Sequence, residues 1–146
     1  MSAIPILVLH VDDDQDDRTL FSRAMHKAGI DANIVHAADG AECLRKLETI
    51  TPEIIFLDIN MAGMNGKECL KNIRAEQRFD SIPVIMLSTS DHVSDIEETF
   101  ESGASLFTVK PFRTDDLVVL LKNIFTGNWR QHLLQRNRAS YVRTVV

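Results

Sequence analysis

Ile54-Ile55-Phe56-Leu57-Asp58-Ile59-Asn60-Met61 is the stretch that decides the fold. Its apolar residues, mostly β-branched or aromatic, run into a single carboxylate, and a loop with Gly63 and Gly66 follows. A short continuous apolar run between turn residues is typical of a strand buried on both faces of a parallel sheet. Open α/β sheets bind their ligands at the carboxyl ends of such strands, so Asp58 is the first candidate for the chemistry. Aspartate is also a common turn and cap residue, so a purely local role for Asp58 stays open.

Three further segments have the same apolar character, at residues 6–11, 82–87 and 106–109, and a fourth at residues 32–37 is less apolar, as expected for a strand at the edge of the sheet. Between them, apolar residues recur at the three- and four-residue spacing of amphipathic helices. We expect these helices to start at residues such as Asp39, Ser90 or Asp91, and Thr114, and to end near Gly29, Gly103 and Gly127. Their expected buried faces comprise Leu20, Phe21, Ala24, Met25, Ala28, Ala41, Leu44, Leu47, Cys69, Leu70, Ile73, Val93, Ile96, Phe100, Leu117, Val118, Leu121, Ile124 and Phe125.

Strand and helix patterns thus alternate five times between residues 6 and 126. Such alternation predicts an α/β fold with a doubly wound parallel sheet, right-handed crossovers and helices on both faces. We expect a five-stranded sheet of order 2-1-3-4-5, in which the first and third strands flank the point where the winding reverses.

Size and composition point to a single soluble domain. The chain has 146 residues, of which 45% are hydrophobic and 25% charged. It contains no run of about 18 apolar residues, so no membrane-spanning helix is expected. The first five residues lack the basic region of a signal peptide, and Cys43 and Cys69 show no metal-binding spacing. We therefore expect reduced thiols and a cytoplasmic location.

The net charge of −5 is unevenly distributed along the chain. Residues 127–146 contain four arginines and no acidic residue, which leaves residues 1–126 at −9. So acidic a body argues against nucleic acid as the main partner and favours a site that holds a cation.

Polar residues follow the strands where each one ends. Asp12 and Asp13 follow the first strand, Asp58 the third, Ser88 the fourth and Lys110 the fifth. In the expected strand order these side chains meet at one edge of the sheet. Several carboxylates at close range require a compensating cation, and Mg²⁺ is the ion that carboxylates, a carbonyl and waters satisfy.

Carboxylate, Mg²⁺, hydroxyl and ammonium around one point are the requirements of phosphoryl transfer to an aspartate. Each residue also has an ordinary explanation: Ser88 as a turn residue, Lys110 as a surface lysine, and His10 as a core histidine within its strand. The joint occurrence at four strand ends favours the functional interpretation, with Asp58 as nucleophile.

These residues resemble a known family. The motifs Val11-Asp12-Asp13, Leu57-Asp58, Ser88-Thr89 and Lys110-Pro111-Phe112, in this order, are similar to those of the receiver domain of two-component response regulators. The resemblance covers about residues 4–126 and implies the flavodoxin-like arrangement of the five strands. It also implies that the protein is a signalling protein rather than an enzyme, and that Asp58 accepts a phosphoryl group from a histidine kinase or a phosphotransfer protein.

The resemblance further implies the ligands of the metal. Asp13, Asp58 and the backbone carbonyl of Asn60 would hold Mg²⁺, with Asp12 acting through a coordinated water. One departure from the family lies nearby, because Ala62 occupies a position where proline is frequent. Losing the fixed φ of proline should loosen this loop slightly without loss of chemistry.

The remaining motif residues match the switch of the family. Ser88 corresponds to the switch hydroxyl, Phe107 to the switch aromatic, and Lys110 to the lysine that reaches the phosphoryl oxygens. Phosphorylation would draw the Ser88 loop inward and let Phe107 rotate, which remodels the surface of the fourth helix, fifth strand and fifth helix. Phe107 replaces a frequent tyrosine and therefore lacks its hydroxyl. The Lys110–Pro111 peptide is expected to be cis in this family.

Residues 127–146 form an extension that is too short for a DNA-binding module, so no output domain is expected. Trp129 and Leu133 could face the body from a short helix, and the end of the chain is rich in apolar residues: Tyr141, Val142, Val145 and Val146. Two interpretations stay open. Either the extension packs on its own domain, or it is an arm of a homodimer that uses the fourth helix–fifth strand–fifth helix face. The second interpretation resembles stand-alone receivers that work with phytochrome-type photoreceptor kinases.

A Mg²⁺-dependent phosphatase of the haloacid-dehalogenase type is the alternative function, because it too uses an aspartate after a buried strand. That chemistry needs a second acid two residues after the nucleophile, and the position is Asn60. Turnover of small phosphomonoesters would distinguish the two.

Overall fold

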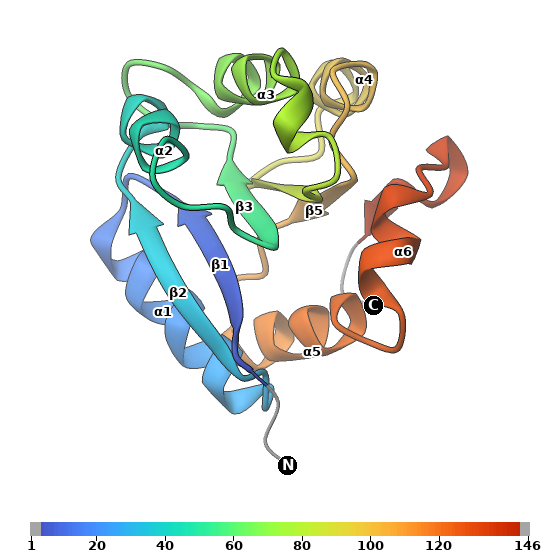
Figure 1. The fold of residues 1–146 in the computed structure, drawn as a ribbon. Helices are drawn as coiled ribbons and strands as arrows, with labels where there is room; N and C mark the ends of the chain where they lie inside the picture. Colours follow the sequence, from blue (N-terminus) through green and yellow to red (C-terminus); the bar gives the residue numbers. More distant parts are fainter. Residues whose placement is uncertain (1–3, 144–146) are drawn as a thin grey trace.

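A parallel β-sheet runs through the middle of the protein in the computed structural model, which describes residues 4–143 (Figure 1). The strand order is β2-β1-β3-β4-β5-β6, and each neighbouring pair is parallel. The first five strands confirm the predicted doubly wound order, and the sixth was not predicted. The strands are β1 Ile6–Val11, β2 Ala32–Ala37, β3 Ile54–Asp58, β4 Val84–Ser88, β5 Leu106–Val109 and β6 Val142–Arg143.

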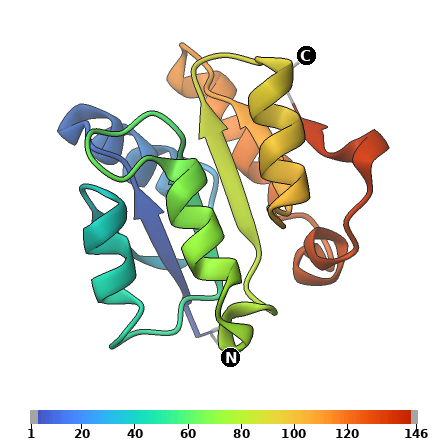
Figure 2. The same ribbon diagram turned by 90° about the horizontal axis from the view of Figure 1, so that it is seen from above.

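Helices cover both faces of the sheet (Figures 1 and 2). Helices α1 and α5 pack on one face, and α2, α3 and α4 pack on the other. None of the helices in the described part of the chain combines the length and apolar character needed to cross a bilayer. The helices are α1 Gln15–Lys27, α2 Gly40–Lys46, α3 Gly66–Arg74, α4 Val93–Glu101, α5 Thr114–Ile124 and α6 Trp129–Leu134, with short 3-10 turns at η1 Gln77–Phe79 and η2 Arg138–Ser140.

The central strand β3 divides the core into two halves. Every residue of β3 is buried, as the continuous apolar run predicts. Because successive side chains of a strand point to opposite faces, Phe56 belongs to the cluster under α1 and α5, and Leu57 to the cluster under α2, α3 and α4. The carboxyl end of β3 is therefore held rigidly between two packed layers.

Helix α4 begins later than the sequence predicts. Its N-cap is His92, so neither Ser90 nor Asp91 caps the helix, and Val93 lies in the exposed first turn with 71% of its surface accessible. The expectation that Val93 is buried is therefore wrong. Helix α5 likewise begins at Thr114 itself, with Arg113 as its N-cap. Asp39 caps α2 as predicted, by accepting the amide of Glu42.

The C-terminal extension packs on its own domain. Leu133 of α6 is buried in the cluster under α1 and α5, and the ring of Trp129 lies 5.0 Å from that of Phe125. Tyr141 is buried in the opposite cluster, and Val142 pairs with Phe107 as β6 adds to the edge of the sheet. The apolar residues Val145 and Val146 lie outside the described residues.

We predict that Leu133→Ala lowers the free energy of unfolding by about 2–5 kcal/mol, the usual cost of truncating a buried leucine. Denaturant unfolding measures this loss. The matched control is Leu134→Ala, since Leu134 has 42% of its surface exposed. A surface change of this kind should stay within about 0.5 kcal/mol of the wild type. Equal effects of the two variants would mean that α6 does not pack as described.

Candidate functional site

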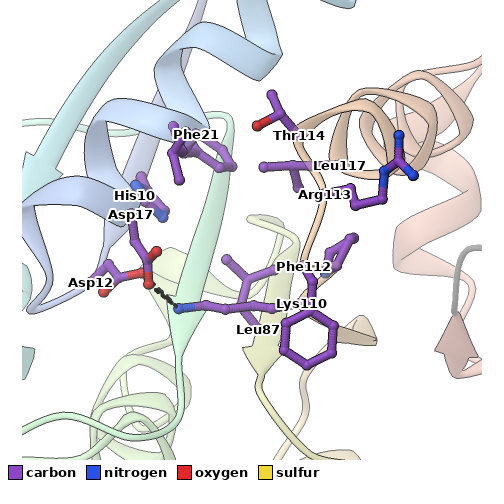
Figure 3. Close-up of a pocket in the computed structure, with 12 residues that line it drawn as sticks. His10, Asp12, Asp17, Phe21, Leu87, Lys110, Phe112, Arg113, Thr114 and Leu117 are labelled. Atoms are coloured by element: carbon purple, nitrogen blue, oxygen red, sulfur yellow. Dashed lines mark hydrogen bonds and ion pairs between the residues drawn. The ribbon is translucent and has the colours of Figure 1, made fainter.

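The side chain of Lys110 reaches a cluster of carboxylates at the carboxyl edge of the sheet, and Figure 3 shows it pointing toward Asp12 and Asp17. Its Nζ lies 2.8 Å from Oδ2 of Asp12, 2.8 Å from Oδ2 of Asp58 and 3.2 Å from Oδ2 of Asp17. Asp12 and Asp58 are almost completely buried, with 1% and 5% of their surface exposed. The predicted convergence of Asp12, Asp58 and Lys110 is therefore present.

The sheet itself brings these residues together. Val11 of β1 pairs with Leu57 of β3, so Asp12, directly after β1, lies level with Asp58, the last residue of β3. Lys110 follows β5, two strands away from β3, and its long side chain spans the distance. Its backbone amide donates to the carbonyl of Ser88 at 2.7 Å, which fixes the position of the Lys110 backbone.

Burial and the Lys110 ammonium act in opposite directions on Asp58. Burial raises the pKa of the Asp58 carboxyl and outweighs the hydrogen bond and charge of Lys110, which lower it. For Lys110, burial alone would lower the pKa, but the hydrogen bonds to Asp12 and Asp58 raise it above its ordinary value. The lysine is therefore charged at neutral pH, and a further positive charge near Asp58 would favour its ionised form.

Asp13 completes a group of three carboxylates that could bind a metal ion. Oxygens of Asp12, Asp13 and Asp58 all lie within 4.8 Å of one another, and the side chain of Asp13 is exposed. The single ammonium of Lys110 cannot neutralise this group together with Asp17. Hard oxygen donors, an excess of negative charge and one open side fit a Mg²⁺ ion that keeps several waters.

The loop after β3 is folded tightly against the site. The amide of Asn60 donates to Oδ1 of Asp58 at 3.2 Å, and the amide of Ala62 approaches Oδ2 of Asp13 at 3.4 Å. Gly66 starts α3 directly beside β3, where a Cβ atom would lie 2.1 Å from the carbonyl oxygen of Asp58. Only glycine fits at this position, which explains a residue that the sequence marked merely as part of a loop.

Ser88 and Phe107 lie behind the carboxylates. Ser88 is fully buried at the end of β4, and its Oγ accepts the amide of Ser90 at 3.1 Å. Phe107 is also fully buried, within the cluster under α2, α3 and α4. Their positions are compatible with the predicted switch, and their roles stay predictions.

The expected cis peptide between Lys110 and Pro111 is absent, since none of the peptide bonds in residues 4–143 is cis. This prediction is wrong for the structure described. The trans form of an X–Pro bond is intrinsically favoured by about 0.5–1 kcal/mol. With a trans bond, Lys110 already reaches Asp12 and Asp58, so its contacts do not require the rarer isomer.

Two residues of the site were missed by the sequence analysis. Asp17 contacts Lys110, and the guanidinium of Arg18 donates to the backbone carbonyl of Asp12 at 2.7 Å. The available signal was the cap: Asp14 accepts the amides of Asp16 and Asp17, which fixes the direction of the first turn of α1. Asp17 also lies four residues before Phe21, so helical spacing puts it on the same side of α1 as the buried face.

His10 is a core histidine, as predicted. It is 1% exposed, stacks on Phe21 with ring centroids 3.9 Å apart, and shares a hydrogen bond between Nδ1 atoms with His36 at 3.1 Å. Burial lowers the pKa of both histidines, so the pair is neutral at pH 7. Next to His10, a shallow pocket opens between α1 and α5, and Phe112 stands fully exposed at its rim (Figure 3).

Comparison with known proteins gives one family. Residues 8–122 match the model of the response regulator receiver domain. Among curated proteins, the chain is similar to the transcriptional regulatory protein PrrA of Mycobacterium tuberculosis, with 36% identity over 115 residues. This match covers 79% of the chain and 48% of PrrA, so the chain spans about half the length of that relative.

Two solved structures are similar along most of their length. The phosphorylated cyanobacterial phytochrome response regulator RcpA superposes with a TM-score of 0.77 at 25% identity, covering 83% of this chain and 91% of RcpA. The chemotaxis response regulator CheY4 of Vibrio cholerae superposes with a TM-score of 0.73 at 30% identity, covering 84% and 100%. The predicted flavodoxin-like receiver fold is confirmed.

Proposed function

The chain belongs to the response regulator receiver family, a family of phosphorylation-dependent signalling domains, and from this premise we propose that Asp58 reversibly accepts a phosphoryl group with the help of Mg²⁺. The observation that carries the proposal is the position of Lys110, whose Nζ lies 2.8 Å from both Asp12 and Asp58. An ammonium fixed beside a buried carboxylate is placed to neutralise the oxygens of an incoming phosphoryl group.

In the proposed reaction an Asp58 carboxylate oxygen attacks the phosphorus of a phosphohistidine in line with the leaving nitrogen. An O–P bond forms, the N–P bond breaks, and the leaving imidazole keeps the electron pair and takes up a proton. The amide of Asn60, which donates to Oδ1, leaves Oδ2 as the oxygen shared with Lys110. Burial between two packed layers keeps the carboxylate in one orientation and limits access of water.

Asp13, Asp58 and the carbonyl of Asn60 would hold Mg²⁺, with Asp12 acting through a water. When bound, the ion supplies positive charge that neutralises the phosphoryl oxygens. The raised pKa of Asp58 makes this charge useful before phosphorylation as well, because a cation favours the ionised carboxylate that the attack needs.

The partner that we propose as donor is a sensor histidine kinase or a phosphotransfer protein. The similarity to RcpA, a phytochrome response regulator, supports a kinase of the phytochrome type.

We also propose a cytoplasmic location, in agreement with two buried and unbridged cysteines. A second copy of the chain as partner, bound through α4, β5 and α5, stays a prediction, as does the absence of a nucleic acid partner.

Nothing favours the phosphatase alternative. The acid that it needs two residues after Asp58 is replaced by Asn60, and only the backbone amide of Asn60 contacts the carboxylate. We expect no more than slow loss of the protein's own phosphoryl group.

The proposal predicts that the protein incubated with Mg²⁺ and a small acyl phosphate gains one phosphoryl group. Intact-mass measurement detects the gain, and peptide mapping should place it on the segment that contains Asp58. Omitting Mg²⁺ or adding a chelator should reduce the yield by roughly 10²-fold or more, since the main charge facing the phosphoryl oxygens is lost. Rapid multiple turnover of small phosphomonoesters would instead favour the phosphatase.

A further inference from the structure

Residues 136–143, here called the C-terminal clamp, bond to both β5 and α4, two elements that also pack on each other in the core. The backbone carbonyl of Tyr141 accepts the amide of Phe107 in β5 at 2.9 Å. The phenol of the same residue reaches α4, where its hydroxyl lies 2.7 Å from Oγ1 of Thr99. Tyr141 and Thr99 are buried, with 1% and 0% of their surface exposed. One buried residue therefore bonds to both elements.

The direction of the second hydrogen bond is fixed by the neighbours of Thr99. The hydroxyl of Thr99 donates to the carbonyl of Asp95 at 2.7 Å, so its oxygen accepts from Tyr141. Burial raises the pKa of Tyr141 to about 12, which keeps the phenol protonated as the donor. The contact therefore depends on a single hydroxyl group, and phenylalanine would remove it without changing the ring.

Two arginines attach the clamp to the far end of α4. The Nε atom of Arg136 donates to the carbonyl of Ala104 at 2.8 Å, and its guanidinium stacks 4.2 Å above the ring of Phe100. Arg138 forms an ion pair with Glu97. Figure 2 shows this red segment beside the yellow helix α4. The clamp thus holds α4 from its middle to the loop that follows it.

The clamp also lies directly next to the expected switch. Phe107, whose amide it accepts, is the aromatic residue of β5, and the ring of Tyr141 lies 6.3 Å from that of Phe107. On its other side β5 pairs with β4, where Ser88 is opposite Val109. Because the clamp bridges β5 and α4, a displacement of α4 relative to β5 must break the Tyr141–Thr99 bond or pull the clamp off β5.

We propose that the C-terminal clamp is a phosphorylation-sensitive latch, which holds α4 against β5 in the resting protein and is released when Asp58 is phosphorylated. The inference rests on the proposed function. Since coupling between two sites is reciprocal, a closed clamp also opposes phosphorylation to the same extent as phosphorylation opposes the clamp. Release would uncover the surface of α4 and the edge of β5 for a partner.

The alternative explanation is that the clamp permanently covers the edge strand β5, since sheet edges are commonly covered to prevent association. A permanent cover would be equally tight before and after phosphorylation. The two explanations therefore differ in the rate at which the clamp opens after phosphorylation, which can be measured.

Hydrogen exchange of the full chain measures opening of the clamp, because the buried amide of Phe107 donates to the carbonyl of Tyr141 and exchanges only when the clamp leaves β5. The probes are Mg²⁺ with a small acyl phosphate in excess, or Mg²⁺ alone, and intact mass is recorded on the same samples. We expect the Phe107 amide to exchange at least roughly 5-fold faster in the phosphorylated protein, the lower end of typical coupling between sites.

Tyr141→Phe removes the hydroxyl that bonds to Thr99. Without phosphate, the Phe107 amide of this variant should exchange roughly 2- to 12-fold faster than in the wild type, the effect of losing one net hydrogen bond. Phosphorylation should then increase the exchange rate of this amide by a smaller factor than it does in the wild type. The matched control is Ser140→Ala, because the Ser140 side chain contacts only the carbonyl of Asn137 at 3.4 Å.

The outcomes separate this inference from the proposed function. If the mass shows a phosphoryl group but the exchange rate of the Phe107 amide is unchanged, the latch is refuted and the phosphoacceptor role stands. If the mass shows no phosphoryl group, the proposed function fails and the latch fails with it. Equal rates for Tyr141→Phe and Ser140→Ala would also overturn the latch, whatever the mass shows.

Discussion

Asp58→Asn is expected to abolish phosphorylation of the protein by a small acyl phosphate and by a histidine kinase. The amide that replaces the carboxylate is not a nucleophile, and the loss should be on the order of 10⁶-fold, the scale seen when a covalent nucleophile is removed. Intact mass after incubation with Mg²⁺ and the donor measures the result. The variant should fold normally, because Lys110 keeps its contact with Asp12 and the amide of Asn60 keeps an oxygen acceptor.

The matched control for this change is Asp31→Asn. Asp31 is exposed and contributes its backbone carbonyl, not its side chain, to the hydrogen bond with Ile6. This variant should be phosphorylated like the wild type. A phosphoryl group found on the Asp58→Asn protein would show that another residue is the acceptor and would remove the role assigned to Asp58.

Gly66→Ala is expected to lower the free energy of unfolding by at least about 3 kcal/mol, at the upper end of the costs of overpacking. The added Cβ would lie 2.1 Å from the carbonyl oxygen of Asp58 and 2.8 Å from Cα of Ile59. Both atoms belong to the backbone of a buried segment and cannot rotate away. The gain of about 1 kcal/mol in helix propensity from glycine to alanine does not compensate for this clash.

Denaturant unfolding gives the stability of this variant, and the phosphorylation assay gives its activity. Because the clash presses on the backbone of Asp58, we expect phosphorylation to fall as well in whatever fraction stays folded. Gly29→Ala is the matched control: its φ of +77° costs about 1–2 kcal/mol for a residue with a side chain. A Cβ atom at Gly29 would have no neighbour within 4 Å, so its phosphorylation should be normal. A Gly66→Ala protein as stable as the Gly29→Ala protein would mean that the start of α3 is not in close contact with the end of β3.

The arrangement of the site could be predicted where one residue follows each strand. Asp12 and Lys110 directly follow β1 and β5, Asp58 is the last residue of β3, and parallel strands end at the same edge of a sheet. Knowing the strand order was sufficient to bring them together. Asp17 could not be found in this way, because its contact with Lys110 depends on the rotation of α1 about its axis.

The C-terminal extension shows the opposite case. Trp129 and Leu133 predicted a short helix against the body, and α6 has this form. Strand β6 has only two residues, which is too short for an alternating pattern, and it exists because the open edge of β5 offers hydrogen-bond partners. Whether the extension would pack on its own domain was therefore undecided until the edge of the sheet was seen.

The sequence by itself determined the alternation of strands and helices, the parallel order of the first five strands, and the carboxylates and lysine that meet at their ends. These features follow from local patterns, since apolar runs and helical spacing report burial residue by residue. Only the tertiary structure decided the trans bond before Pro111, the exposure of Val93 and the bridge from Tyr141 to Thr99. The hydrogen bond from Tyr141 to Thr99 joins segments that are far apart in the chain. All three features depend on how whole elements pack rather than on any pattern within one of them.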